Sequence, residues 1–419
     1  MNTMDAARPW WAAPSFPLAV ALAIAPAAGV LQSKALAPIA VVALAGCVLA
    51  HRRALGGWSW PVDFPRNILA GLALATFGWA ALTAAWAPEP WRALGTALQL
   101  GGFVALGIAA ARAVAADAVA AQRRLLRLAT AGLVGGLALA GLDAASGNAI
   151  RAAVRGLETI PPGLAFGLKP AASAMALWLP LVAAAPLPRW LRALVLLGGA
   201  AVLVALPGEA AKLAVGAALV TGAVALLLPR RTAVTLGAAL ALAIIAMPLA
   251  LGPVLTRGVP AAGIPPSAAH RLLIWDFVIH RIDDRPLLGW GMEASRSIPG
   301  RSDHPGPAAL GRFGLDGGSA SHGWLATAQL LPLHPHNGAL QLRLELGWPG
   351  VVLAALLAAG LALACGNAVA LAMLAAGAVT AMLSFGIWQE WWVGAELLAL
   401  AAAAGVPRRE ADQASSESR

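Results

Sequence analysis

Charged residues are scarce in this chain. Asp, Glu, Lys and Arg make up 11% of its 419 residues, whereas about 25% is usual for soluble domains. Hydrophobic residues account for 60%, and the mean hydropathy is +0.76. This composition excludes a large soluble domain and favours a polytopic membrane protein. Cysteine is also rare: Cys47 and Cys365 are the only two, and both lie in apolar segments, so no disulfide framework is implied.

The apolar segments are long enough to cross a bilayer many times, since one crossing takes about 20 mostly apolar residues. We predict an all-α polytopic membrane protein of about 12 transmembrane helices, packed closely through small Ala and Gly residues. The predicted spans are 16–32, 35–50, 67–86, 94–111, 125–142, 171–187, 191–206, 212–228, 233–252, 338–362, 367–386 and 391–406. The first apolar run is interpreted as an uncleaved span rather than a signal peptide, because a second span follows almost at once.

These spans divide the chain into four parts. Residues 1–252 hold transmembrane helices 1–9, residues 253–337 form one large outer loop with short amphipathic helices, residues 338–406 hold helices 10–12, and residues 407–419 are a cytoplasmic tail. With the N-terminus in the cytoplasm, fifteen of the 29 Lys and Arg residues fall on the cytoplasmic side, as the positive-inside rule expects. The net charge of +10 is spread over membrane loops, which indicates contact with the lipid bilayer and anionic substrates, and no nucleic acid.

The loop 253–337 contains six of the seven histidines. Within it, residues 270–280 have apolar side chains at helical spacing, which predicts an amphipathic helix at the membrane surface. Residues 285–291 predict a turn that ends this helix. The Gly-, Ser- and Pro-rich stretch 297–323 is interpreted as a mobile lid.

The most informative segment is His334-Pro335-His336-Asn337, where the loop meets the next span. Asn337 is a favoured N-cap for a helix that begins at Gly338, and the first turn of such a helix attracts anions such as phosphate. Asn337, Gln341 and Glu345 are spaced by four residues, so they form one polar stripe along the helix, and polar residues in membrane helices tend to mark function. A neutral histidine here is suited to accept a proton from a sugar hydroxyl.

Two other interpretations of these histidines remain open. They can be merely solvated at the level of the lipid headgroups, or the His-x-His pair can supply two metal ligands. We favour no metal, because no cluster of cysteines or carboxylates lies nearby to complete a zinc site.

Outer cations next to membrane helices are the second candidate group, and they comprise Lys169, Lys212 and Arg271. Such cations can hold a diphosphate and stabilise its charge as it leaves. The alternative is that they extend to the interface as ordinary snorkelling side chains. The segment 384–392 is a weaker candidate: its tryptophans fit an interfacial aromatic belt, and Gln389 and Glu390 are candidates for lining a sugar groove.

These motifs resemble those of the O-antigen ligase and O-antigen polymerase family of bacterial membrane glycan transferases. The similar residues are His336–Gln341, Glu345–Gly347, Gly350, Arg271, Trp275 and Arg285–Gly291. The resemblance covers roughly residues 160–360 in motifs and the whole chain in topology. It implies a bacterial inner-membrane enzyme whose site faces the periplasm, with both termini in the cytoplasm.

The resemblance further implies an O-antigen ligase that transfers a glycan from an undecaprenyl-diphosphate-linked donor to a lipid A-core acceptor. His336 would be the general base, with Arg271, Lys212 and Lys169 on the donor diphosphate and His334 in support, and the reaction would invert the anomeric centre without metal or cofactor. The family usually has arginine where this chain has Lys169 and Lys212, and lysine keeps the charge but loses the bidentate fork.

Three alternatives are compatible with the sequence. An O-antigen or exopolysaccharide polymerase uses the same donor with another glycan chain as acceptor, and a protein O-glycosyltransferase differs only in acceptor. A transporter of lipid-linked glycans belongs to a different class. It should show inverted repeats and charges near mid-membrane, whereas the polar residues here gather at the outer rim.

Overall fold

The computed structural model describes residues 9–60, 67–317 and 322–407, and within these ranges it consists of helices, turns and loops without strands. Every predicted span overlaps a helix, although α7 covers only the first half of the span 171–187. These helices are α1 (Phe16–Leu31), α2 (Leu36–Leu55), α3 (Ile68–Leu82), α4 (Pro90–Ala115), α5 (Val119–Ala145), α7 (Leu168–Trp178), α8 (Arg189–Ala205), α9 (Glu209–Leu227), α10 (Pro229–Arg257), α14 (Gly338–Ala364), α15 (Ala368–Leu383) and α16 (Glu390–Ala404). A short helix α6 (Ala149–Val154) follows α5, and 3-10 turns flank α7 at Pro162–Gly167 and Leu179–Ala184.

Eight of the described helices, some with flanking 3-10 turns, are long and apolar enough to cross a membrane: α2, α3, α4, α5, α7, α9, α10 and α14. Two shorter apolar helices, α1 and α15, add to them. These helices support a multi-pass membrane protein, while the count of about 12 and the sidedness of the loops stay predictions. Of the fifteen Lys and Arg residues predicted on the cytoplasmic side, Arg8, Arg66 and the three arginines after Pro407 lie outside the described residues.

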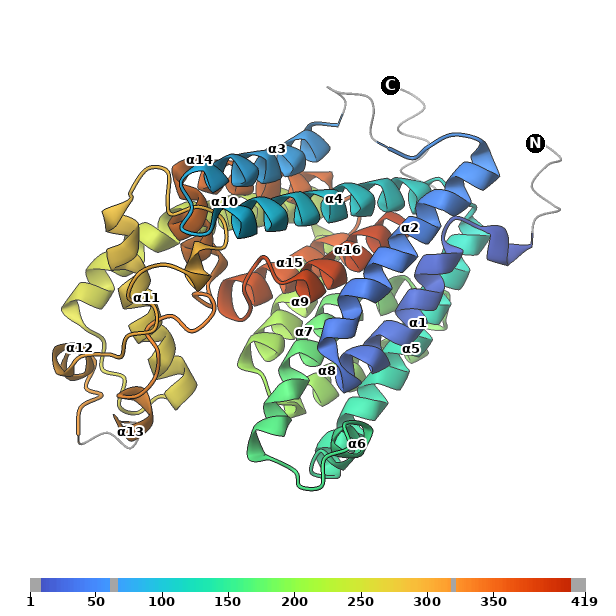
Figure 1. The fold of residues 1–419 in the computed structure, drawn as a ribbon. Coiled ribbons are helices and arrows are strands. Elements are labelled where there is room, and N and C mark those ends of the chain that lie inside the picture. The colour runs from blue at the N-terminus through green and yellow to red at the C-terminus, as the bar shows by residue number, and fades with distance from the viewer. Residues whose placement is uncertain (1–8, 61–66, 318–321, 408–419) are drawn as a thin grey trace.

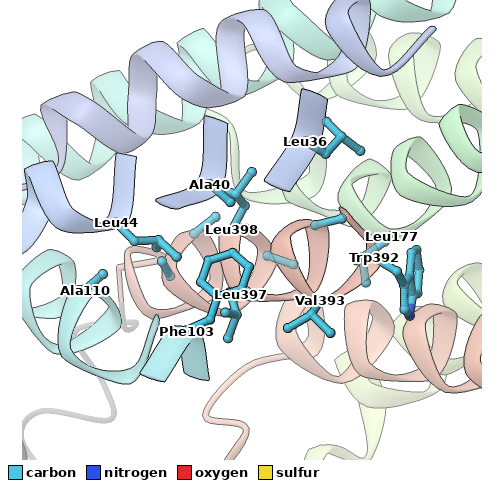
Figure 2. Close-up of a cluster of buried hydrophobic side chains, with 14 of the residues drawn as sticks. Leu36, Ala40, Leu44, Phe103, Ala110, Leu177, Trp392, Val393, Leu397 and Leu398 are labelled. Carbon is cyan, nitrogen blue, oxygen red and sulfur yellow. The ribbon is translucent and has the colours of Figure 1, made fainter. Parts of the chain in front are cut away.

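The main core surrounds α16, the last helix. Leu397 and Trp392 of α16 are buried between Leu44 of α2, Phe103 of α4 and Leu177 of α7 (Figure 2). Small residues allow the close packing that the composition predicts. A Cβ added at Gly132 of α5 would lie 2.3 Å from the carbonyl oxygen of Leu22 in α1, so these two helices pack backbone to backbone.

The loop 253–337 folds into α11 (Pro266–Asp284), a 3-10 turn at Ala294–Arg296, α12 (Pro307–Arg312) and α13 (His322–Leu325). These helices gather on one side of the molecule, away from α1, α2 and α5 (Figure 1). The predicted helix at 270–280 is confirmed as part of α11, and Arg285 ends it as expected. Its apolar residues do not need a bilayer to cover them, because Ile274 and Val278 pack against Leu340 and Leu344 of α14.

The interpretation of 297–323 as a lid stays a prediction. Residues 318–321 lie outside the described ranges, and the rest carries α12. In this described part Leu310, Phe313 and Leu315 are buried in one cluster with Leu273 of α11.

One break in a helix shapes the neighbourhood of the site. Gly347 interrupts α14 with φ 63° and ψ −160°, where a Cβ would lie 2.2 Å from the carbonyl oxygen of Leu287, so only glycine fits. The carbonyls that the break frees from helical bonding still need donors. The Trp290 and Gly291 amides donate to the carbonyls of Leu344 and Glu345, both at 2.8 Å. The turn at 285–291 is therefore hydrogen-bonded directly to α14 at this break.

Candidate active site

Asn337 fixes the start of α14, as predicted. Its side-chain Oδ1 accepts a hydrogen bond from the Leu340 amide at 3.0 Å, and its Nδ2 lies 2.8 Å from the sulfur of Met247 in α10. The residue is 1% exposed. Because the cap is held from both sides, the three residues that precede it enter the helix at a defined angle.

His336 sits in an unusual backbone conformation at this entry point. Its φ of +56° is in the left-handed region, which costs a residue with a Cβ about 1 kcal/mol or more and persists only where the surroundings enforce it. Its amide donates to Nδ1 of His334 at 3.2 Å, and its own ring Nδ1 bonds the carbonyl oxygen of Ser384, in the loop after α15. A carbonyl oxygen only accepts, so Nδ1 of His336 carries the proton and Nε2 keeps its lone pair free.

His334 supports this arrangement from behind. It is buried, its ring lies 4.2 Å from that of His336 in an edge-to-face contact, and its Nδ1 accepts the His336 amide. On its other side is Gly386, where a Cβ would lie 2.9 Å from Cγ of His334. These contacts place His334 directly against His336 and Gly386, and its supporting role stays a prediction.

Burial and positive charge keep both imidazoles neutral. Burial first lowers the pKa of His336, the Ser384 carbonyl opposes this, and the charges of Arg271, His270 and Lys169 lower it further, to about 4. Burial likewise lowers the pKa of His334, to about 2, with smaller contributions from His336, Arg296 and Arg271. At neutral pH the free Nε2 of His336 can therefore accept a proton.

Two of the three predicted cations act on this histidine. Arg271 is half-buried and makes no hydrogen bond or ion pair with any residue that the structure describes, and burial lowers its pKa. Lys169 places Nζ 4.4 Å from the centre of the Phe166 ring. A Cβ at Gly208, four residues before Lys212, would lie 3.4 Å from Cγ of Lys169, whereas Nζ of Lys212 itself is engaged by Glu209 at 2.8 Å. Of the three predicted cations, Arg271 and Lys169 are therefore the two that form no ion pair with a described carboxylate.

A buried ion pair supports the turn that precedes Lys169, and sequence reasoning missed it. Arg151 and Asp143 are fully buried, with Nε 2.6 Å from the carboxylate. Nη1 of Arg151 also donates to the Leu164 carbonyl at 2.7 Å. Removing one partner of such a pair strands a charge, so this contact holds the 3-10 turn before α7 in place.

The residues of the predicted polar stripe, Asn337, Gln341 and Glu345, are all buried. Glu345 accepts hydrogen bonds from the Glu293 amide at 2.8 Å, from Trp388 Nε1 at 2.6 Å, from Gln341 Nε2 at 3.2 Å and from the Ser295 hydroxyl. In turn, Oε1 of Gln341 accepts the Ile387 amide at 3.1 Å. The stripe therefore connects α14 to the 384–389 loop that holds His336.

Several residues of the site could not be assigned from the sequence. Ser384, Gly386 and Trp388 belong to the segment that drew attention only for its tryptophans, and Arg296 and Ser295 lie in the 3-10 turn of the large loop. Gln389, a candidate for a sugar groove, accepts a hydrogen bond from Trp391 Nε1 at 3.1 Å, and Glu390 is exposed, so their part in a groove stays a prediction. Within the described ranges, no group of three or more His, Cys, Asp or Glu side chains is arranged to hold a metal ion.

Comparison with known proteins finds similarity over part of the chain. A protein of Rickettsia conorii is 34% identical over 142 residues, which are 32% of this chain and 31% of that protein. A protein of Rickettsia prowazekii is 36% identical over 135 residues, 30% of each chain, and one of Rickettsia felis is 32% identical over 152 residues, 32% and 31% of the two chains. No family model and no solved structure matches. The chain thus spans about a third of the length of the curated relatives it matches, and each of these is named "putative polysaccharide ligase".

Proposed function

We propose that this protein is an O-antigen ligase of the bacterial inner membrane. It transfers a glycan from undecaprenyl diphosphate to the lipid A-core of lipopolysaccharide, at a site that faces the periplasm. The names of the similar proteins support a glycan ligase in general. The observation that carries the proposal is the free Nε2 of His336, which is neutral and lies in the field of Arg271 and Lys169.

In the proposed reaction His336 is the general base. Nε2 takes the proton of an acceptor sugar hydroxyl while its oxygen attacks the anomeric carbon of the donor glycan. A new glycosidic C–O bond forms as the bond from that carbon to the diphosphate oxygen breaks. Undecaprenyl diphosphate leaves from the opposite face, so the anomeric configuration inverts. No step requires a metal or a covalent enzyme intermediate.

Arg271 and Lys169 stabilise the leaving group. The negative charge on the diphosphate rises as the bond breaks, and cations that are partly removed from water act on it more strongly than they would in bulk solvent. Arg271 is suited to this task because it has no acceptor among the described residues, so all its donors are free for phosphate oxygens.

The same cations couple donor binding to the base. Without donor, Arg271 and Lys169 disfavour the charged form of His336 and lower its pKa. A bound diphosphate offsets these charges, so it raises the pKa of His336 towards the working pH. We infer that the base becomes stronger only once the donor is in place, which suits proton abstraction at neutral pH.

Reconstitution of the full chain in proteoliposomes tests the proposal. Undecaprenyl-diphosphate glycan is supplied as donor, with purified lipid A-core as acceptor in one arm and a second lipid-linked glycan in the other. A ligase gives glycan attached to lipid A-core in the first arm alone. Chain growth in the second arm without product in the first would establish a polymerase instead. Failure in both arms, with intact donor, would refute transfer from this donor.

A further inference from the structure

A cavity of about 470 Å³ lies between α10, α11 and α14, and its lining contains none of the residues around His336. Most of its wall is apolar, with Pro248 and Leu249 from α10 and Ile279 and Ile282 from α11. Three charged residues also line it, Arg343 of α14, Arg257 of α10 and Asp283 of α11, so the two cations outnumber the one carboxylate. Arg343 lies about 9 Å along the helix from Asn337 at 1.5 Å per residue.

Arg343 is buried without an acceptor. The residue is 5% exposed, its Nη1 is buried with no hydrogen-bond partner, and no other described residue forms a hydrogen bond or ion pair with its guanidinium. Its guanidinium carbon lies 4.4 Å from the Trp348 ring centre, a contact that favours the cation but accepts no N–H in the plane of the group. Buried donors are nearly always satisfied, so this cavity is suited to a ligand with anionic oxygens.

The surroundings of the cavity indicate an amphiphile rather than a free anion. Only 17% of the most apolar stretch of α10 is buried, the smallest share among the eight candidate spans. Beside the cavity, Leu249 is 57% exposed and Val254 is 47% exposed. In a membrane this surface faces lipid tails, while Thr256 and Arg257 stand near the end of the helix, where headgroups lie.

We propose that the cavity binds a phospholipid of the surrounding bilayer, with Arg343 holding its phosphate and the tails lying along α10. The site is independent of the proposed transferase function, because it shares no residue with the His336 cluster. A phospholipid meets both requirements at once: its phosphate supplies the missing acceptors, and its tails cover apolar walls that a free ion would leave bare.

Binding is measured by native mass spectrometry on the full chain, purified in detergent and stripped of lipid. The probes are dioleoyl phosphatidylglycerol, dioleoylglycerol, which lacks the phosphate, and inorganic phosphate. Arg343→Met should bind phosphatidylglycerol at least about tenfold more weakly than wild type. Arg231→Met, at the exposed opposite end of α10, is the matched control and should bind as wild type does. Leu249→Trp, which fills the cavity from its rim and keeps Arg343, should also weaken binding.

Thermal melting separates a ligand site from a structural role. Without lipid, Arg343→Met should melt at the same or a higher temperature than wild type, because it removes a buried guanidinium that forms no ion pair with Asp283 or any other described carboxylate. Phosphatidylglycerol should raise the Tm of wild type and of Arg231→Met but leave that of Arg343→Met unchanged. Equal binding by wild type, Arg343→Met and Leu249→Trp would overturn the proposal. The proposal would also be overturned if dioleoylglycerol or inorganic phosphate raised the Tm of wild type as much as phosphatidylglycerol does. The same holds if undecaprenyl phosphate bound in an Arg343-dependent way while phosphatidylglycerol did not bind.

Discussion

Replacement of Arg271 by methionine tests the link between the cations and the base. The lowering of the His336 pKa from 6.5 to about 4 corresponds to about 3.4 kcal/mol in favour of the neutral ring. Burial is its largest cause, and Arg271 is the first of the three charges that add to it. Arg271→Met should therefore raise the pKa of His336, because it removes the first of these three charges while burial remains. It should also raise the KM for donor about 10-fold or more, since it removes charge-assisted bonds to the diphosphate.

The assay is initial-rate transfer in proteoliposomes between pH 3 and 8. The active form of a base is the unprotonated one, so activity falls as the pH drops through its pKa. For wild type, the acid limb of kcat/KM for donor should have its midpoint near the donor-free pKa of about 4. The acid limb of kcat should have its midpoint at a higher pH, because bound diphosphate offsets the charges of the cations and so raises the pKa of His336.

In Arg271→Met the midpoints of the acid limbs of kcat/KM and of kcat should lie closer together than in wild type, because one of the charges that the donor offsets is already absent. Arg271→Lys should restore the pH profile but only part of the donor affinity. Arg189→Met, an exposed arginine at the start of α8, is the matched control. An unchanged acid limb together with an unchanged KM would refute the coupling of Arg271 to both the donor and His336.

Two further outcomes are expected. Gly386→Ala would place a methyl group 2.9 Å from Cγ of His334. Because this displaces His334 and with it His336, the substitution should lower kcat at least about tenfold and reduce the free energy of unfolding by about 1–3 kcal/mol. Unchanged kcat in the folded variant would contradict the positioning role of His334. Acid should destabilise the fold, because the pKa values of His334 and His336, about 2 and about 4, lie below the unfolded value of 6.5. The unfolded chain then binds more protons between pH 6.5 and 4, so stability present above pH 6.5 is lost as the pH falls, by up to about 2 kcal/mol per histidine at pH 5. The drop in Tm from pH 7 to pH 5 should be smaller in His336→Gln, and an equal drop would argue against the depressed pKa.

Local features of the fold were predictable from the sequence, whereas contacts across long separations were not. The Asn337 cap depends on a residue three positions away, so its pattern is visible in the sequence. The helical spacing of 270–280 likewise predicted α11, but spacing alone does not show whether protein or lipid covers an apolar face. The break at Gly347 was missed because hydropathy reads 338–362 as one span, although Gly347-Trp348-Pro349 was a usable signal.

The orientation of His336 depends on residues that only the tertiary structure brings together. Its Nδ1 partner, Ser384, is 48 positions away, and Trp388 reaches Glu345 across 43 positions. Charge and residue type indicated that Lys169, Lys212 and Arg271 belong near an anion. They could not show that Glu209 engages Lys212 while Arg271 stays without a partner among the described residues. The pairing of opposite charges is decided by the packing of the helices, which a pattern within one sequence does not specify.

The central claim is that His336 is the base, and the rate of glycan transfer by His336→Ala in proteoliposomes tests it most directly. His304→Ala is the control, since His304 is an exposed histidine of the same loop. General-base catalysis contributes about 10²–10⁴-fold, so His336→Ala should lose transfer by that factor while it still binds donor and melts like wild type, and His304→Ala should keep its rate. Transfer by a folded His336→Ala protein within a few-fold of wild type would contradict the account.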